Sequence, residues 1–154
     1  MKRLAISLIA ISAAVAGCGW MKEDASSREV DQKVEEVEFQ AKETRTRSGL
    51  AQIEASLKAF TDAEKRIPDS LDELVPKYLA DIPLVEIGIR GYHDSNAVKV
   101  YPRNVLVDGT IDGSKLKDTG RWGYVHNDNQ VVVFVDCTEK SSKGIPWYQE
   151  RGVY

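Results

Sequence analysis

The feature that most constrains the fold is a long stretch without a helix breaker: no proline occurs before Pro68. Over residues 29–66, acidic residues repeatedly precede basic ones by four positions, the favourable order for ion pairs on a helix surface. These pairs are Glu29/Lys33, Glu38/Lys42, Glu43/Arg47, Glu54/Lys58 and Asp62/Arg66. Ser26 and Glu29 have the spacing of a capping box at the start. We therefore predict one helix of about 38 residues, roughly 57 Å long.

Apolar residues in this helix form two separate stripes. The first consists of Val30, Val34, Val37 and Ala41, and the second of Leu50, Ile53, Leu57 and Phe60. The second stripe is wide enough to cover a sheet, whereas the first is narrow and flanked by charge. Between them, residues 42–49 have no apolar face and end at Gly49, a weak helix position. The pattern predicts a helical stalk over residues 18–48 and a globular domain over residues 49–154.

Two interpretations of the first stripe stay open. It is either part of a solvated spacer or a coiled-coil-like seam through which Val30, Val34 and Val37 dock a partner helix. Valine is a mediocre helix former in exposed positions, so a plain spacer gives no reason to keep three valines in register. The partner in the second interpretation is another protein or a second copy of this chain.

The chain after Pro68 contains a short helix and several strands. Ser70 and Glu73 form a second capping box, which predicts the short helix. Strand-like segments cover residues 86–90, 98–101, 104–107, 122–126 and 130–136, and the last two form a hairpin across a polar turn. Because residues 130–136 are apolar on both faces, we expect an inner strand with one face against the long helix. The glycine- and aspartate-rich residues 107–120 are expected to be a loop.

The first 17 residues have the layout of an export signal: a basic start, an apolar stretch over residues 4–16, then small residues. The apolar stretch spans roughly 20 Å, too short for a hydrocarbon core of roughly 30 Å. Its end, VAGC at residues 15–18, resembles the lipobox of bacterial lipoproteins. The resemblance implies acylation of Cys18, a durable anchor, and, because Gly19 follows, sorting to the outer membrane. An ordinary export signal next to an accidental cysteine is the alternative.

Composition and charge exclude several classes of function. The formal net charge is −3, and removal of the signal takes away two basic residues, so no electrostatic footprint for nucleic acid or anionic lipid is present. No phosphate-binding loop, zinc-ligand spacing or nucleotide-binding glycine motif occurs. His93 and His126 stand beside Asp or Asn in turn-like segments, where we expect surface roles. The sequence therefore predicts no enzyme and no cofactor.

Three aspartates and one cysteine remain as candidates for metal binding or thiol chemistry. Asp108, Asp112 and Asp118 carry the oxygen atoms that calcium prefers, but their spacing matches no calcium loop, so we expect turn residues and no metal. If Cys18 is acylated, Cys137 has no partner within the chain. We expect Cys137 to be a half-buried thiol at the end of a strand, with an intermolecular disulfide as the alternative.

Two parts of the chain resemble type II secretion pseudopilins and related type IV pilins. The first is LAQIEASLKAF…KRIPDSLDELVPKYLADIP, residues 50–83, where a helix leads through a turn into a short helix. The second is TGRWGYV…VVVFVDCTEKSSKGIPWY, residues 119–148, which is similar to the closing hairpin and tail of these proteins. The resemblance implies a pilin-like α+β fold, with a long N-terminal helix packed on a small antiparallel sheet. Pilins keep a long apolar segment in the mature helix; here that region is charged, so filament formation is not implied.

Together these features predict a non-enzymatic, lipid-anchored envelope protein that faces the periplasm. The pilin resemblance implies a structural or docking role in a type II secretion or type IV pilus-like system. Expected contacts are the membrane through Cys18 and protein partners or a second copy, with no nucleic acid. The alternative is an envelope lipoprotein that uses a pilin-like fold to bind a small ligand, a metal ion or a glycan. A deep aromatic pocket around Trp122 or Trp147 would favour this alternative.

Overall fold

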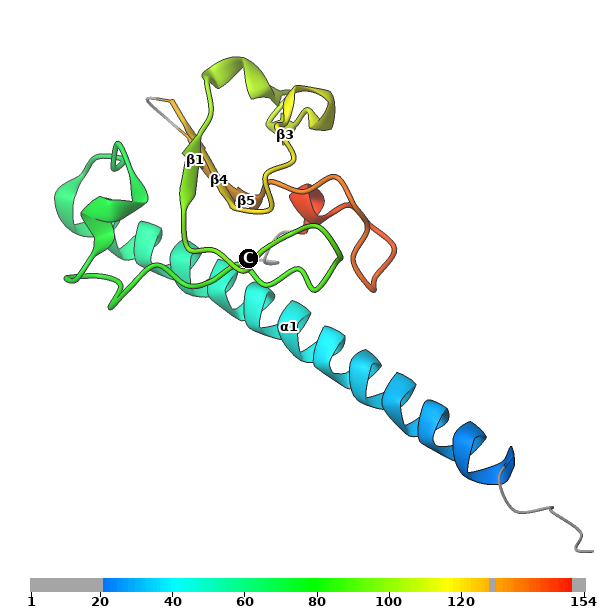
Figure 1. The fold of residues 1–154 in the computed structure, drawn as a ribbon. Coiled ribbons are helices and arrows are strands. Elements are labelled where there is room, and N and C mark those ends of the chain that lie inside the picture. Colours follow the sequence, from blue (N-terminus) through cyan, green and yellow to red (C-terminus); the bar gives the residue numbers. More distant parts are fainter. Residues whose placement is uncertain (1–20, 128–129, 151–154) are drawn as a thin grey trace, which may run out of the picture. The chain divides into compact units, whose positions relative to one another are not determined.

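The computed structural model describes residues 21–127 and 130–150, with side chains from residue 27 onward. The signal region and the predicted lipidation site Cys18 lie outside these residues. Two compact units divide the chain, with the boundary between Val34 and Glu35, and helix α1, Met21–Glu64, belongs to both. The second unit adds a three-stranded and a two-stranded sheet (Figure 1), so the fold class is α+β as predicted.

Helix α1 confirms the predicted long helix but begins before the expected capping box. Ser26 lies inside the helix, so its assignment as the N-cap is wrong. The residues of α1 that pack against the rest of the second unit recur at spacings of four and three: Phe39, Glu43, Thr46, Leu50, Ile53, Leu57 and Phe60. This spacing keeps them on one side of the helix. The buried side is therefore continuous, with two polar residues near its N-terminal end.

Residues 42–48, expected to belong to the stalk, lie in the second unit and are bonded to the rest of it through polar groups. The Thr46 hydroxyl donates to the Glu86 carbonyl at 2.9 Å and accepts from the Glu86 N–H at 2.7 Å. These bonds satisfy the buried threonine without an apolar contact. The compact unit begins at Glu35, so the domain start expected at residue 49 lies inside it.

The three-stranded sheet has the order β1-β4-β5, formed by Val98–Val100, Trp122–His126 and Val131–Val135. Strands β4 and β5 form the predicted antiparallel hairpin, with Trp122 opposite Val135. Strand β1 pairs with β4 in the parallel direction, so the expectation of a wholly antiparallel sheet is wrong at this pair. The physical reason is the crossover between β1 and β4, which brings the chain back to the sheet in its original direction.

Strand β5 lies at an edge, because β4 is its only neighbour among the described strands. The expectation of an inner strand is therefore wrong, although both faces of β5 are covered. Val133 and Val135 belong to a core cluster with Leu57 of α1, whereas Val132 and Phe134 belong to a second cluster. The apolar residues on both faces of β5 thus reflect two cores, one on each side of the sheet.

The segment that connects β1 to β4 covers the second core. Strands β2, Leu106–Val107, and β3, Thr110–Ile111, make a short hairpin where the sequence predicted mainly loop. Its turn residues Asp108 and Gly109 both have positive φ, as a two-residue type I′ turn requires. Ile111 is buried in the second core. The aspartate–glycine turn therefore serves to place an apolar residue on the sheet.

The short helix predicted after Pro68 is a 3-10 helix. The 3-10 helices are η1, Leu71–Leu74; η2, Arg103–Val105; η3, Gly113–Lys115; and η4, Trp147–Gln149. The Ser70 side chain makes no capping bond, and the Glu73 carboxylate accepts from the N–H of Asp69 at 2.6 Å, one residue before the expected N-cap. Residues 86–90 are not a strand; Val85 and Ser95 form an isolated bridge beside them.

Candidate functional site

Three valines on the surface of α1 form the first candidate site. Val30, Val34 and Val37 are 56, 51 and 65 % exposed, and we call them the valine seam. At 3.6 residues per turn, Val34 and Leu50 lie about 160° apart around the helix. Val37, the member of the valine seam in the second unit, is about 140° from Leu50 and thus faces away from the residues that pack on the sheet.

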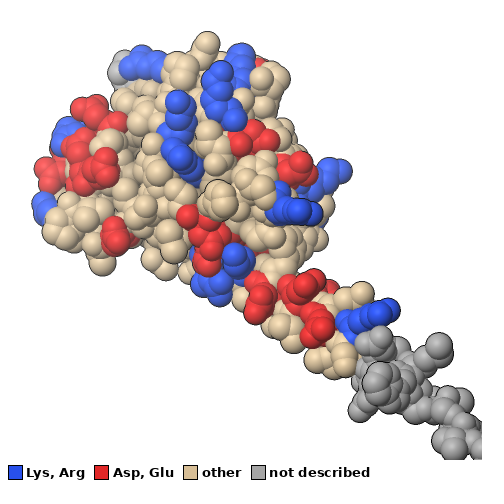
Figure 2. All heavy atoms as spheres, viewed as in Figure 1, with Lys and Arg blue, Asp and Glu red and all other residues tan. Residues whose placement is uncertain are grey.

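Acidic side chains surround the valine seam. Over residues 28–38 they are Glu29, Asp31, Glu35, Glu36 and Glu38, and the basic residues are Arg28 and Lys33. Lys33 donates to Glu29 at 2.9 Å, which neutralises one of the cations locally. Figure 2 shows mostly red side chains, with blue ones near the end of the described helix, along this part of α1. Such a surface suits a partner that carries apolar residues between basic ones.

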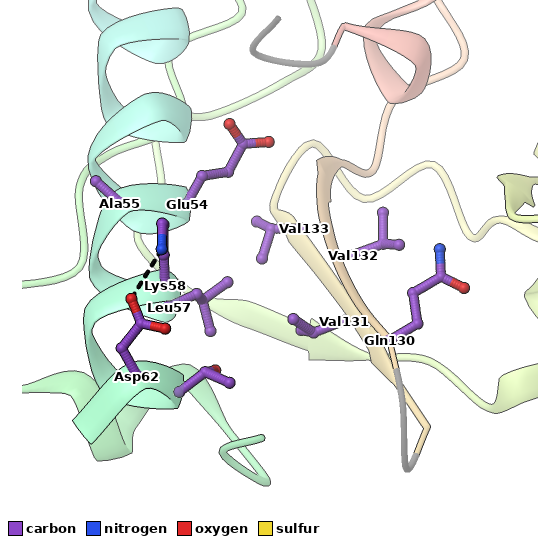
Figure 3. A pocket seen from close by; sticks show the side chains of 10 residues that line it. Glu54, Ala55, Leu57, Lys58, Asp62, Gln130, Val131, Val132 and Val133 are labelled. Atoms are coloured by element: carbon purple, nitrogen blue, oxygen red, sulfur yellow. Dashed lines mark hydrogen bonds and ion pairs between the residues drawn. The ribbon is translucent and has the colours of Figure 1, made fainter. Parts of the chain in front are cut away.

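A groove between α1 and β5 is the second candidate site (Figure 3). Its volume is about 740 Å³. It is lined by Glu54, Ala55, Leu57, Lys58, Thr61 and Asp62 of α1 and by residues 130–133. Val131 and Val133 point toward the helix, and Val132 points away. Lys58 and Asp62 form an ion pair of 2.8 Å, so the groove has an apolar floor and a charged rim.

A buried polar cluster joins α1 to the C-terminal loop. Glu43 accepts from the N–H of Ser142 at 2.7 Å and also from its hydroxyl. Arg47 donates to Glu43 at 3.2 Å and to Glu150 at 2.9 Å, and both carboxylates are nearly fully buried. The guanidinium also lies over the Trp147 ring, 5.2 Å from its centroid. These carboxylates are held by groups of the protein itself, so the cluster is a structural link.

The titration of this cluster agrees with a structural role. Burial raises the pKa of Glu150, but hydrogen bonds from Arg47, Ser141 and Lys143 outweigh it and hold the pKa below its usual value. Burial lowers the pKa of Arg47, and the hydrogen bond and charge of Glu150, with the charge of Glu43, raise it above its usual value overall. Both groups therefore stay charged at neutral pH, whereas a general acid or base is tuned to titrate near it.

The three aspartates of the glycine-rich segment are used in turns. Asp112 caps η3 by accepting from the Ser114 N–H, and Asp108 stands in the β2–β3 turn. Asp118 accepts from the N–H of Thr138 at 2.7 Å. Within the described ranges, no three His, Cys, Asp or Glu side chains gather where they could hold a metal ion. The geometry thus places these aspartates in turns and loops, where Asp112 and Asp118 form structural hydrogen bonds.

The histidines and the cysteine take no part in either candidate site. His93 is exposed, and His126 is half-buried beside the Tyr124 ring, 5.5 Å between centroids. Cys137 is free and fully buried, more so than expected. Burial raises the pKa of its thiol to about 11. Because the thiolate is the reactive form, this residue is inert at neutral pH.

Trp122 and Trp147 are both fully buried in the core. The Trp122 indole N–H donates to the Pro83 carbonyl at 2.7 Å. Neither tryptophan lines the groove beside β5 or the smaller hollow of about 310 Å³ near Gly49. In the part of the chain that the structure describes, these residues therefore serve packing, and they do not supply the aromatic pocket that would favour ligand binding.

No family model, curated protein or solved structure matches this chain. Among residues 21–127 and 130–150, no helix combines the length and the hydropathy needed to cross a membrane. The valine seam, the groove and the N-terminal motif are thus the features from which a function can be inferred.

Proposed function

We propose that the protein is a lipid-anchored docking protein of the bacterial envelope, without enzymatic activity, in a type II secretion or type IV pilus-like assembly. The lipobox-like residues 15–18 support the anchor at Cys18. The pilin-like segments, residues 50–83 and 119–148, support the kind of assembly. The outer membrane, with the domain in the periplasm, is the proposed location because Gly19 follows the cysteine.

The observation that carries the docking role is the exposure of the valine seam. Its three side chains are more than half exposed and in helical register, and Val37 faces away from the residues that pack on the sheet. Full burial of a valine is worth about 1.5–3 kcal/mol relative to leaving it exposed. The spacing of four and three residues is that of a helix–helix seam, so the partner element is a helix.

The charge around the valine seam narrows the choice of partner. A second copy packed seam to seam would bring two acidic surfaces together, and such like-charge contacts oppose association. A helix of another protein, with basic residues beside its apolar ones, pairs favourably with Asp31 and Glu38. We therefore place an exposed helix of a pseudopilin-like partner on this surface.

A photo-crosslinking amino acid in the full, membrane-anchored chain tests this docking role. Position 34 lies in the valine seam, and position 36 lies about 200° away around the helix. A crosslinker that replaces Val34 should capture one partner protein in cells, whereas a crosslinker that replaces Glu36 should capture none. Equal capture at both positions, or capture at neither, would contradict docking through the valine seam.

A further inference from the structure

The hydrogen-bonding direction along β5 follows from the bonds at its two ends. The N–H of Asn127 donates to the carbonyl of Gln130, and the N–H of Asp136 donates to the carbonyl of Arg121, both at 2.8 Å. In an antiparallel pair, hydrogen-bonded and non-bonded residue pairs alternate. With the register of β4 and β5, the residues of β5 that bond to β4 are therefore the even-numbered ones.

Val131 and Val133 accordingly direct their N–H and C=O groups away from β4, at the sheet edge that borders the groove. None of the described residues forms a backbone hydrogen bond with these groups. Val131 is half-buried and Val133 only 3 % exposed, so the groups of Val133 lie at the floor of the groove. Unpaired polar groups at such a place are costly, and a ligand that bonds to them removes that cost.

The edge of β5 also lacks the features that protect exposed strands. Natural edge strands carry lysine, proline or a bulge that prevents pairing with another chain. Residues 130–135, Gln-Val-Val-Val-Phe-Val, contain no charge and no proline, and their register with β4 is continuous. The outer edge of β5 can therefore form hydrogen bonds with a further strand.

We propose that the groove binds an extended segment of a partner protein, which pairs with β5 as an additional strand. A polypeptide backbone offers a donor and an acceptor at the two-residue repeat of Val131 and Val133, whereas an acyl chain leaves both unpaired. In antiparallel pairing, the two partner residues opposite these valines direct their side chains toward Leu57, and the residue between them faces the other way. The recognised pattern is therefore apolar, any residue, apolar.

A second copy of this chain fits the groove less well. Antiparallel pairing of two β5 strands requires a two-fold axis, and that axis reverses one α1 relative to the other. Two chains anchored through Cys18 would then leave the pair in opposite directions. This argument against a second copy depends on the proposed lipid anchor. The argument for strand pairing depends only on the backbone groups of β5.

Residue-resolved hydrogen exchange of the full chain in lipid nanodiscs tests the proposal. The probe is the acetylated, amidated peptide Thr-Val-Ser-Val-Thr at millimolar concentration, and its control carries N-methyl groups on both valines. The probe should slow exchange of the Val131 and Val133 amides about tenfold, because each gains a hydrogen bond, and the control should not. Slowing by the N-methylated peptide as well, or slowing by neither, overturns strand pairing.

Two variants of Val131 sharpen the test. Val131→Pro removes one outward N–H at the first position of the strand, where proline is tolerated, and leaves the bonds to β4 intact. It should weaken binding of the probe about tenfold, whereas Val131→Ala keeps the N–H and should weaken binding less, through the lost side-chain contact alone. Unchanged protection of the β4 and β5 amides in the absence of peptide shows that both variants fold. Equal binding of the probe by both variants overturns the proposal.

Other occupants give different results. Protection of Val131 and Val133 without peptide that rises with protein concentration identifies a second copy and overturns the proposal. Protection that disappears only when the chain ends at Glu150 assigns the edge to residues 151–154 and overturns it too. None of these measurements involves the valine seam, so docking on α1 and strand pairing on β5 can fail independently.

Discussion

Leu57 and Val34 are apolar residues of the same helix with opposite surroundings. Leu57 is 5 % exposed and belongs to the core cluster that includes Trp122, whereas Val34 is 51 % exposed. Leu57→Ala should lower the free energy of unfolding by about 2–5 kcal/mol through lost burial and a cavity. Val34→Ala should change it by less than about 0.5 kcal/mol. Urea unfolding of both variants measures the difference, and equal midpoints would place Leu57 outside the core.

Glu150 gives the folded chain a pH dependence that can be measured. Because its pKa is lower in the folded state than in the unfolded one, its stabilising contribution is present above about pH 4.3 and is lost as the pH falls through the folded pKa. Glu150→Gln should cost about 1.5–3 kcal/mol at pH 7, where charged hydrogen bonds to Arg47 and Lys143 are lost.

The check is a comparison of Glu150→Gln with wild type across pH. Since glutamine does not titrate, the difference in unfolding free energy between the two proteins should shrink below about pH 4. A difference that stays constant from neutral to acidic pH would show that the Glu150 carboxylate is not ionised in the buried cluster.

At the scale of elements, Gly49 decides how closely α1 approaches the loop at Pro83. A Cβ at residue 49 would stand 2.9 Å from the Pro83 Cβ and 3.4 Å from the Trp122 ring. Alanine is the better helix former by about 0.5–1 kcal/mol, but the crowding should cost about 1–3 kcal/mol and outweigh that gain. Gly49→Ala should therefore destabilise the protein in thermal unfolding. Ser48→Ala, at an exposed neighbour, is the control and should be neutral or slightly stabilising.

The extent of α1 follows from its sequence, but the extent of its buried face does not. The apolar spacing of Leu50, Ile53 and Leu57 predicts packing on a sheet, and these residues form the core. Glu43 and Thr46 continue the same spacing as polar residues, so the apolar pattern misses them. Their burial depends on partners distant in sequence, such as Ser142 and Glu86, which a local pattern does not contain. The only sequence feature that pointed to the buried polar cluster was the four-residue spacing of Glu43 and Arg47, which predicts an ion pair on the helix.

In the sheet, too, the features set by neighbouring residues could be predicted, whereas those set by residues distant in sequence could not. The β4–β5 hairpin is local, because its alternation and its polar turn lie in one segment, and its register is set by that turn. The direction of β1 and the edge position of β5 depend on the path of the crossover, and the residues of β1 do not specify it. The crossover hairpin forms a second core, so both faces of β5 are covered. Its sequence is therefore apolar on both faces, as the sequence of an inner strand would be.

At the scale of the whole molecule, the two candidate sites differ in how far the sequence anticipates them. The valine seam is evident from spacing alone, and its exposure agrees with the docking interpretation. The groove joins Leu57 of α1 to Val131 and Val133 of β5, so it exists only after the chain has folded. The apolar run of residues 130–135 gave no sign that their outer edge would have no neighbouring strand among the described residues.

The proposed lipid anchor gives a prediction for the intact protein in cells. Cys18→Ser removes the sulfur that the acyl chains require, so labelling with a fatty-acid analogue should be lost and the protein should leave the membrane fraction. Cys137→Ser removes the other thiol and should keep both label and location. Unchanged membrane partition and unchanged mass in Cys18→Ser would contradict the anchor.

Docking through the valine seam is the central claim, and simultaneous replacement of Val30, Val34 and Val37 by glutamine tests it most directly. Co-purification from detergent-solubilised envelope is the measurement, with Gln32→Ala and Glu36→Ala on the opposite side of α1 as the control. The triple variant should keep its unfolding midpoint and its membrane location but lose its partner, whereas the control keeps the partner. A triple variant that retains every partner of the wild-type protein would contradict the account and make α1 a spacer at this position.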